Sequence, residues 1–131
     1  MEKRSNGAAF EPDIDTLFFF EGKPAALSLY QPLAAHLLAQ LPDMRIKVSK
    51  TQISFYGRYL FAAASLPKRK KEDYLVVTFG LGYQKESPRI FSSTEAARGR
   101  WTHHAAVRAA AELDAELFGW LREAYEFAAV K

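Results

Sequence analysis

The spacing of apolar residues changes twice along this chain, and that change restricts the fold more than any other feature. Before Pro42 the apolar residues follow helical spacing, between Pro42 and Arg108 they alternate or cluster as in strands, and beyond Arg108 helical spacing returns. Helices, then consecutive strands, then a closing helix are typical of an α+β fold. The chain is therefore predicted to form an antiparallel four- to five-stranded sheet, with N-terminal helices and a C-terminal helix packed on one face.

Two helices are expected in the first third of the chain. Asp13 is suited to cap a short helix over 14–20, because its carboxylate can accept a backbone N–H of the first turn. A second helix is predicted over 24–41, since a proline at the first position is tolerated. Pro32 lies inside this helix and cannot donate to the carbonyl four residues back, so a kink or break is expected near Tyr30.

Strands are expected in the middle of the chain, where the apolar period is two. The predicted strands cover 44–49, 51–56, 59–66, 74–80 and 101–108. The stretch 82–99 shows no regular period, so no strand is predicted there. The final helix is predicted over 112–129, with Trp120 in its apolar stripe and Glu112 and Asp114 in its first turn.

Composition limits the class of protein. The chain has 131 residues, 49% of them hydrophobic, and no cysteine. It can fill one core, and the lack of cysteine excludes disulfides, thiol nucleophiles and cysteine-ligated metal sites. We expect a loose lead-in over 1–11 and a single α+β domain over 12–131. No apolar run suits a membrane span or a secretory signal, so a cytoplasmic location is expected.

Four sequence blocks occur in an order that resembles a known family. They are Lys50 to Phe55 (KTQISF), Gly99 to His104 (GRWTHH), Glu112 to Asp114 (ELD) and Trp120 to Tyr125 (WLREAY). With these blocks the chain resembles the domain of unknown function 5655 family, over most of its length from about Asp13 to Ala128. The resemblance implies a compact bacterial α+β domain, found alone or attached to other modules, and it implies no activity.

The sequence departs from the family pattern at one point. Three alanines, Ala109 to Ala111, stand before Glu-Leu-Asp, where a Ser or Thr helix cap would be usual. We expect this to weaken the start of the last helix by about 1 kcal/mol.

The adjacent histidines His103 and His104 suggest a metal or acid–base site, because imidazole binds metals and titrates near neutrality. Neighbouring side chains on a strand point to opposite faces, so the pair could chelate one ion only if the strand broke there. The third histidine, His36, lies on the flank of a predicted helix. We therefore expect no metal site, and instead one half-buried histidine bonded to the backbone and one exposed histidine.

The basic run 68–71 (KRKK) has two interpretations. Four like charges could meet phosphate groups. Alternatively, the run is the solvated tip of a hairpin, where charge discourages pairing with other sheet edges. Glu72 and Asp73 follow directly, and no aromatic residue interrupts the run to stack a base. The solvated tip is the favoured interpretation.

Polar residues are predicted to gather on the side of the sheet away from the core. The apolar residues of strands 51–56 and 101–108 must face the core, which turns the alternate residues outward. The predicted ligand-binding set combines these outward residues with one arginine of a flanking turn: Lys50, Gln52, Arg58, His104 and Arg108. Such a surface suits an anion, because Arg holds carboxylate or phosphate through paired hydrogen bonds. A solvated sheet face without a ligand is the alternative.

No motif names a reaction, since the chain lacks a Gly-rich phosphate loop and a nucleophile elbow. We therefore expect a non-catalytic binding or interaction module for an anionic or polar ligand or a protein partner, with no cofactor and no membrane partner. A homodimer is compatible with this. Two alternatives remain: a small enzyme with His104 as general base, and a weak nucleic-acid binder through the loop 68–71. The net charge of +3 is low for a dedicated nucleic-acid partner.

Overall fold

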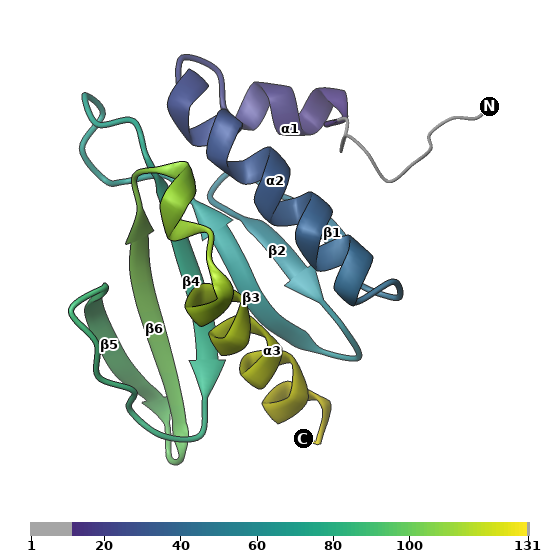
Figure 1. The fold of residues 1–131 in the computed structure, drawn as a ribbon, viewed down its shortest axis with the longest axis vertical. Helices are drawn as coiled ribbons and strands as arrows, with labels where there is room; N and C mark the ends of the chain where they lie inside the picture. The colour runs from purple at the N-terminus through teal and green to yellow at the C-terminus, as the bar shows by residue number, and fades with distance from the viewer. Residues whose placement is uncertain (1–11, 131) are drawn as a thin grey trace.

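The computed structural model describes residues 12–130, and the lead-in expected over 1–11 lies outside the described residues. Its helices are α1 (Ile14–Phe19), α2 (Pro24–Gln40), the short 3₁₀ helix η1 (Ala110–Glu112) and α3 (Ala115–Ala129). Its strands are β1 (Arg45–Val48), β2 (Ile53–Tyr56), β3 (Leu60–Ser65), β4 (Leu75–Leu81), β5 (Ile90–Ala97) and β6 (Arg100–Val107). They form one antiparallel sheet in the order β1-β2-β3-β4-β6-β5 (Figure 1).

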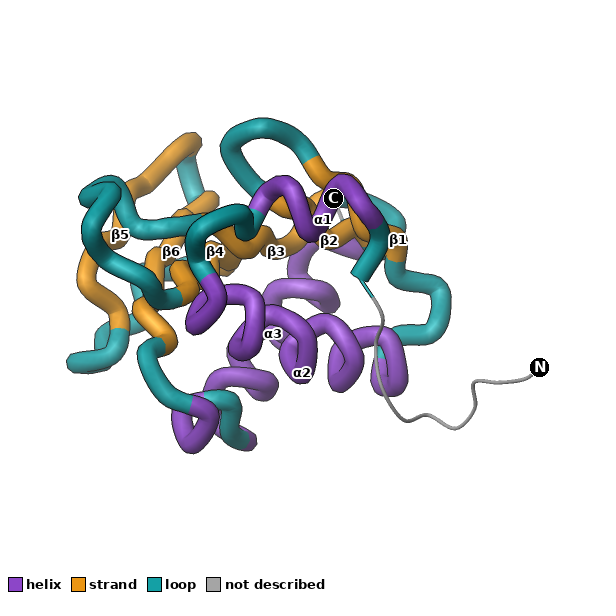
Figure 2. The backbone as a smooth tube through the Cα atoms, turned by 90° about the horizontal axis from the view of Figure 1, so that it is seen from above, coloured by secondary structure: helices purple, strands orange, loops and turns teal. Residues whose placement is uncertain are grey.

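The predicted α+β class and the antiparallel sheet are confirmed, with six strands in place of the expected four to five. The long helices α2 and α3 lie on the same side of the sheet (Figure 2). The strand side chains beneath them are buried, including Ile53, Phe55 and Phe79. We call the opposite side the open face and define it by the strand residues that point away from α2 and α3. Within residues 12–130, no helix is long and apolar enough to cross a membrane.

The first two helices begin as the sequence predicts. The Asp13 carboxylate accepts the Thr16 backbone N–H at 2.9 Å, which satisfies one of the free donors of the first turn of α1. The break that Pro32 was expected to cause near Tyr30 is not found, because α2 is one continuous helix. Because Pro32 has no N–H, the carbonyl of Ser28, four residues back, has no donor within the helix. Both residues are exposed, so water can donate to this carbonyl.

The additional strand is β5, in the stretch where no strand was predicted. It lies at the edge of the sheet, pairs with β6 alone and has six exposed residues out of eight. Its sequence IFSSTEAA carries no apolar alternation, because neither of its faces is buried in the core. Its pairing with β6 also shifts register at two places, which a strict period of two cannot represent.

The last helix starts later than predicted. The residues 110–112 form η1, and α3 begins at Ala115 with Asp114 as its N-cap. The Asp114 carboxylate accepts the Leu117 N–H at 3.0 Å, so the helix start is capped and the expected weakening by the three alanines was wrong. Trp120 lies in the core, stacked on Phe79 with ring centroids 5.6 Å apart.

Candidate functional site

A row of small and polar side chains crosses the open face. The pairing of the strands places these residues side by side, from β1 to β5: Lys47, Ser54, Ala63, Thr78, His104 and Ser92. They share one face because directly opposed residues in an antiparallel sheet point the same way. The middle of the open face therefore carries hydroxyls, an imidazole and a methyl group where the helix side carries large apolar residues.

The charges of the open face are of one sign. Arg45 and Lys47 on β1 and Arg100 on β6 share the parity of Ser54 and His104. Among the strand residues of 12–130 that point to this face, none is Asp or Glu. Glu95, the only acidic residue of the strands described, is paired with Trp101 and has the opposite parity. An anion approaching the open face consequently meets cations and hydroxyl donors.

His104 is the titratable group at the centre of this face. Its Nδ1 is hydrogen-bonded to the Thr78 hydroxyl at 2.8 Å, and the Phe91 ring lies 6.1 Å from its own. Burial, followed by the nearby Lys68 ammonium, lowers the pKa of His104 below its usual 6.5. The imidazole is therefore neutral near pH 7 and can act as a hydrogen-bond donor and acceptor.

His103 points the other way, into the core. Its ring stacks on Phe79 at 5.0 Å, and its Nε2 accepts the Lys85 backbone N–H at 2.9 Å. Burial is the largest cause that lowers the pKa of His103. The adjacent histidines thus lie in different surroundings on opposite faces of the sheet. In the described part of the chain, no group of three or more His, Asp or Glu side chains could hold a metal ion.

A pocket of about 300 Å³ opens where β3 and β4 separate. Their pairing ends at Ala62 and Phe79, whereas β4 continues alongside β6 as far as Leu81. The lining comes from both strand ends, from β6 and from the last turns of α3: Gln52, Leu60, Phe61, Ala62, Ala63, Thr78, Phe79, Gly80, Leu81, Ala96, Arg100, Trp101, Thr102, Phe127 and Ala128. We call this the sheet-gap pocket. It joins an apolar floor to the polar groups of the open face.

In the described part of the chain, Arg100 is the single charged residue that lines the sheet-gap pocket. Arg100 is exposed, and no carboxylate of residues 12–130 lies within ion-pair distance of it. The other polar side chains of the lining are the hydroxyls of Thr78 and Thr102, the Trp101 indole and the Gln52 amide, which donates to the Ser54 hydroxyl at 2.9 Å. The pocket therefore offers a free cation beside apolar walls.

The structure places the five predicted ligand-binding residues in different parts of the sheet. His104 belongs to the open face, and Gln52, directly before β2, donates to Ser54 of that face. Strands β3 and β4 lie between β2 and β6, so three inter-strand spacings or about 14 Å separate the two positions. Lys50 lies in the β1–β2 turn, and the Arg108 guanidinium lies 4.1 Å from the centre of the Tyr74 ring. Arg58 is in the β2–β3 turn, at the other end of β2 from Lys50. Only Gln52 also lines the sheet-gap pocket, and ligand binding by this set stays a prediction.

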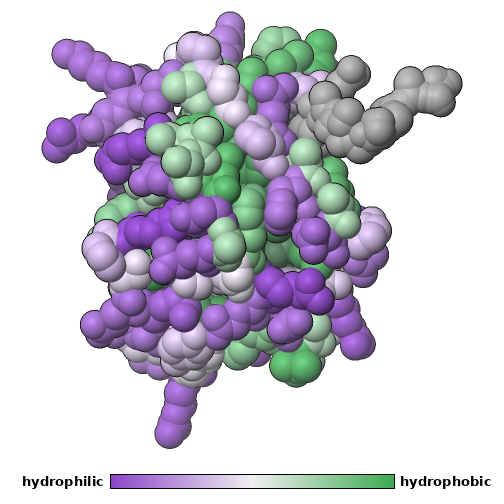
Figure 3. Space-filling view, viewed as in Figure 1, coloured by the Kyte–Doolittle hydropathy of each residue, from purple (hydrophilic) through white to green (hydrophobic). Residues whose placement is uncertain are grey.

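The basic run 68–71 lies in the loop between β3 and β4, where long hydrophilic side chains project at the upper left of Figure 3. The Asp73 carboxylate accepts the N–H groups of Ala25 and Ala26 at 2.9 and 2.8 Å and so caps α2. Lys23 donates to the carbonyls of Lys70 and Glu72 and holds the loop against the start of α2. The loop that carries the basic run is therefore held to the start of α2 by both Lys23 and Asp73.

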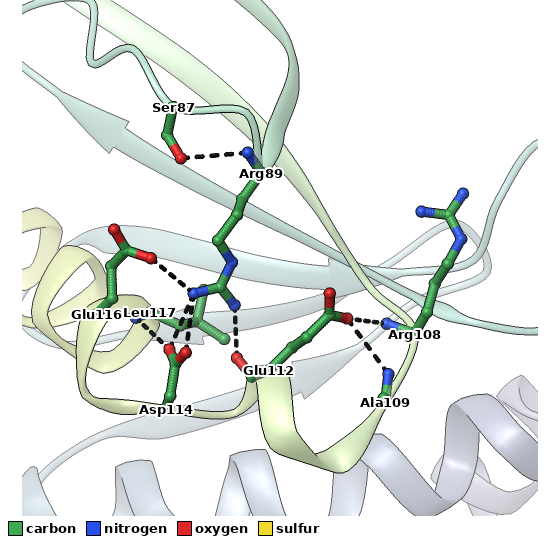
Figure 4. Close-up of polar contacts among 8 residues, drawn as sticks. All are labelled: Ser87, Arg89, Arg108, Ala109, Glu112, Asp114, Glu116 and Leu117. Carbon is green, nitrogen blue, oxygen red and sulfur yellow. Dashed lines mark hydrogen bonds and ion pairs between the residues drawn. The ribbon is translucent and has the colours of Figure 1, made fainter.

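Arg89 fastens the β4–β5 loop to the start of α3 (Figure 4). Its Nη1 donates to Asp114 and to Glu116, both at 2.9 Å, and its Nη2 donates to the Glu112 carbonyl at 2.6 Å. The guanidinium also lies 5.5 Å from the Trp120 ring. With its charge satisfied on the helix side, Arg89 has a structural role and does not contribute to the open face.

A second cavity, of about 490 Å³, lies between α2 and α3, where His36 stacks on Phe118 at 3.7 Å. Apolar surface shows through between hydrophilic side chains on this side of the molecule (Figure 3). Its charged lining residues are already paired, Asp114 with Arg89 and Arg122 with Glu126. The sheet-gap pocket and the open face are therefore the stronger candidate site.

Comparison with known proteins adds a family and no activity. No curated protein and no solved structure matches the chain. The model of the domain of unknown function family DUF5655 matches residues 18–128. This range covers all four sequence blocks, which lie in or next to β2, β6, η1 and α3. Because the match spans most of the chain, this protein belongs to the DUF5655 family.

Proposed function

We propose that this protein is a non-catalytic binding module that holds an anionic ligand on its open face. The observation that carries the proposal is the one-sided distribution of charge. Open-face strand positions bear Arg45, Lys47 and Arg100 and no carboxylate among the strands described. Such a surface raises the local concentration of anions and orients them by hydrogen bonds.

The acidic residues of the closing segment support this proposal from the other side. They belong to η1, α3 and the turn between them: Glu112, Asp114, Glu116, Glu123 and Glu126. Several are paired there, with Arg89, Lys85 or Arg122. Within residues 12–130, the cations of the open face thus have no acidic partner on their own face, whereas those of the helix side are largely matched.

Catalysis by His104 is the second candidate, because the Thr78 hydroxyl lies 2.8 Å from its Nδ1, as a nucleophile lies near a base. Two features favour binding instead. First, within residues 12–130 no carboxylate is hydrogen-bonded to the His104 imidazole to orient it and stabilise its protonated form. Second, the nearby Lys68 ammonium disfavours the protonated form. A hydrolase screen distinguishes the two functions: turnover that is lost in His104→Ala, with the fold retained, would support the enzyme.

The binding proposal is tested by titrating the ¹⁵N-labelled protein with inorganic phosphate and with citrate and recording amide shifts. We expect shifts centred on Ser54, Thr78 and His104 that weaken as NaCl rises from 0.05 to 0.5 M, values chosen to shorten the screening length. The double variant Lys47→Gln, Arg100→Gln should reduce the affinity at least severalfold.

The matched control is Arg122→Gln, which removes an exposed cation from the helix side. It should leave the affinity for both anions unchanged. Shifts confined to the α3 side, or equal losses in the double variant and the control, would overturn the proposal, as would a spectrum that neither anion changes.

A further inference from the structure

Resting on the proposed function, we infer that the sheet-gap pocket binds an aryl carboxylate, with the ring system between β3 and β4 and the carboxylate on Arg100. The inference adds a ligand class to the open face. It follows from the way in which the strands separate, from the size of the pocket and from the placement of its one charge.

The separation of β3 and β4 creates the pocket. A register shift between Phe55 and Tyr56 on the β2–β3 pair coincides with the end of the β3–β4 pairing, so the first residues of β3 turn away from β4. The Phe61 ring instead packs edge-on against Tyr125 of α3, at 5.3 Å. Helix α3 covers the resulting gap with Phe127 and Ala128, and this gives the pocket a floor.

The size of the gap suits a flat ring system. Its volume of about 300 Å³ is at the lower end for small-molecule sites. It is also about twice that of an engineered cavity that holds one benzene molecule, taken as about 150 Å³. One or two fused rings would therefore fill it, with Leu60, Leu81 and Phe127 in contact with the ring faces and edges.

Gly80 keeps the gap open on the β4 side. A Cβ built at this position meets only the Trp101 carbonyl oxygen, at 3.8 Å, which is an ordinary contact. The residue therefore tolerates a side chain sterically, and its lack of one leaves space over the pocket. A valine there would project into the gap without disturbing the backbone, and valine is favoured in strands.

The polar groups of the lining select the charge of the ligand. Among residues 12–130, Arg100 is the one charged residue of the lining, and none of the lining residues is Asp or Glu. A guanidinium binds a carboxylate through two parallel N–H donors, and the Thr102 hydroxyl on the same strand face can donate to it as well. A neutral aromatic ligand would gain the apolar contacts alone.

The test measures the binding of 2-naphthoate and of 2-naphthamide, which share the ring system and differ in charge, by calorimetry and by amide shifts of the full chain. We expect naphthoate to bind at least tenfold more tightly than naphthamide and to shift the amides of Phe61, Gly80 and Thr102. Arg100→Gln should lower the naphthoate affinity roughly tenfold, as the loss of a charged hydrogen bond does, and leave naphthamide binding unchanged. The control Arg98→Gln, in the exposed β5–β6 turn, should change neither.

Gly80→Val should abolish the binding of both compounds while its thermal melt stays cooperative. Equal affinity for the two compounds, unchanged affinity in Gly80→Val, or shifts outside the pocket would overturn the inference. Failure here is distinguishable from failure of the proposed function. Phosphate and citrate bound to the open face without naphthoate in the gap would leave the proposed function standing, and naphthoate bound without them would limit the anion site to Arg100.

Discussion

Replacing Arg89 by methionine tests how the β4–β5 loop is held to α3. The side chain is 18% exposed and makes four separate contacts, with two carboxylates, one carbonyl and the Trp120 ring. Methionine keeps much of the apolar stem and removes the charge and the donors, so the loss of stability reports on the polar contacts. We expect Arg89→Met to fold and to be less stable.

The magnitude follows from the surroundings of each partner. Asp114 and Glu116 are 44% and 55% exposed, so each ion pair contributes about 0.2–1 kcal/mol. The part-buried bond to the Glu112 carbonyl contributes about 1 kcal/mol, and the contact with the Trp120 ring about 0.5–1 kcal/mol. The expected loss is roughly 2–4 kcal/mol in the free energy of unfolding.

This loss is measured by urea denaturation of the parent protein and of Arg89→Met, at low salt and in 1 M NaCl. In 1 M NaCl the screening length falls to about 3 Å. The difference in the free energy of unfolding between the parent protein and Arg89→Met should be smaller in 1 M NaCl, by the contribution of the two ion pairs. Arg122→Met is the matched control, because its pair with Glu126 is an exposed i,i+4 contact that contributes only about 0.3–0.5 kcal/mol. A loss in Arg89→Met below about 0.5 kcal/mol, which is the contribution of one exposed ion pair, would refute the reasoning. A loss no larger than that in Arg122→Met would refute it as well.

Two further predictions concern the core. Trp120→Ala should destabilise the protein by about 3–5 kcal/mol, since the indole is 7% exposed and stacked on Phe79; a loss below about 1 kcal/mol in urea denaturation would contradict its core position. Burial lowers the pKa of His103 from 6.5, so the unfolded chain binds its proton first and stability should fall as pH decreases below about 6.5. The lowered pKa of His104 acts in the same direction, so the contribution of His103 must be isolated with a variant. Between about pH 6.5 and 5.5, the free energy of unfolding should change less steeply with pH in His103→Phe than in the parent protein. An equally steep change would show that His103 does not contribute.

Much of the helical structure could be predicted because its signals are local. Asp13 caps α1 through a bond to a residue three positions on, and the apolar stripe around Trp120 follows from helical spacing alone. The start of α3 was misplaced, since Glu112 and Asp114 are equally suited to a helix N-terminus. The structure divides their roles: Asp114 caps α3, whereas Glu112 accepts the backbone N–H of Arg108 at 2.6 Å.

The candidate site was predicted only in part. Strand parity correctly turned Gln52 and His104 away from the core, because alternation fixes the face of every residue once one residue is buried. Parity gives no distance between strands, however, and two strands lie between these residues. Arg100 was not in the predicted ligand-binding set, because its position beside a pocket depends on where the pairing of β3 and β4 ends.

Apart from β5, the sequence by itself determined the succession of helices and strands and which side chains of the predicted strands enter the core, because propensity, caps and apolar period act over a few residues. Only the tertiary structure decided the strand order, the pairing of β5 at the sheet edge and the gap between β3 and β4. Those features arise from contacts between residues far apart in the chain, such as Phe61 with Tyr125 and Arg89 with Asp114. No local pattern encodes such contacts, since each partner is chosen by the packing of the whole core.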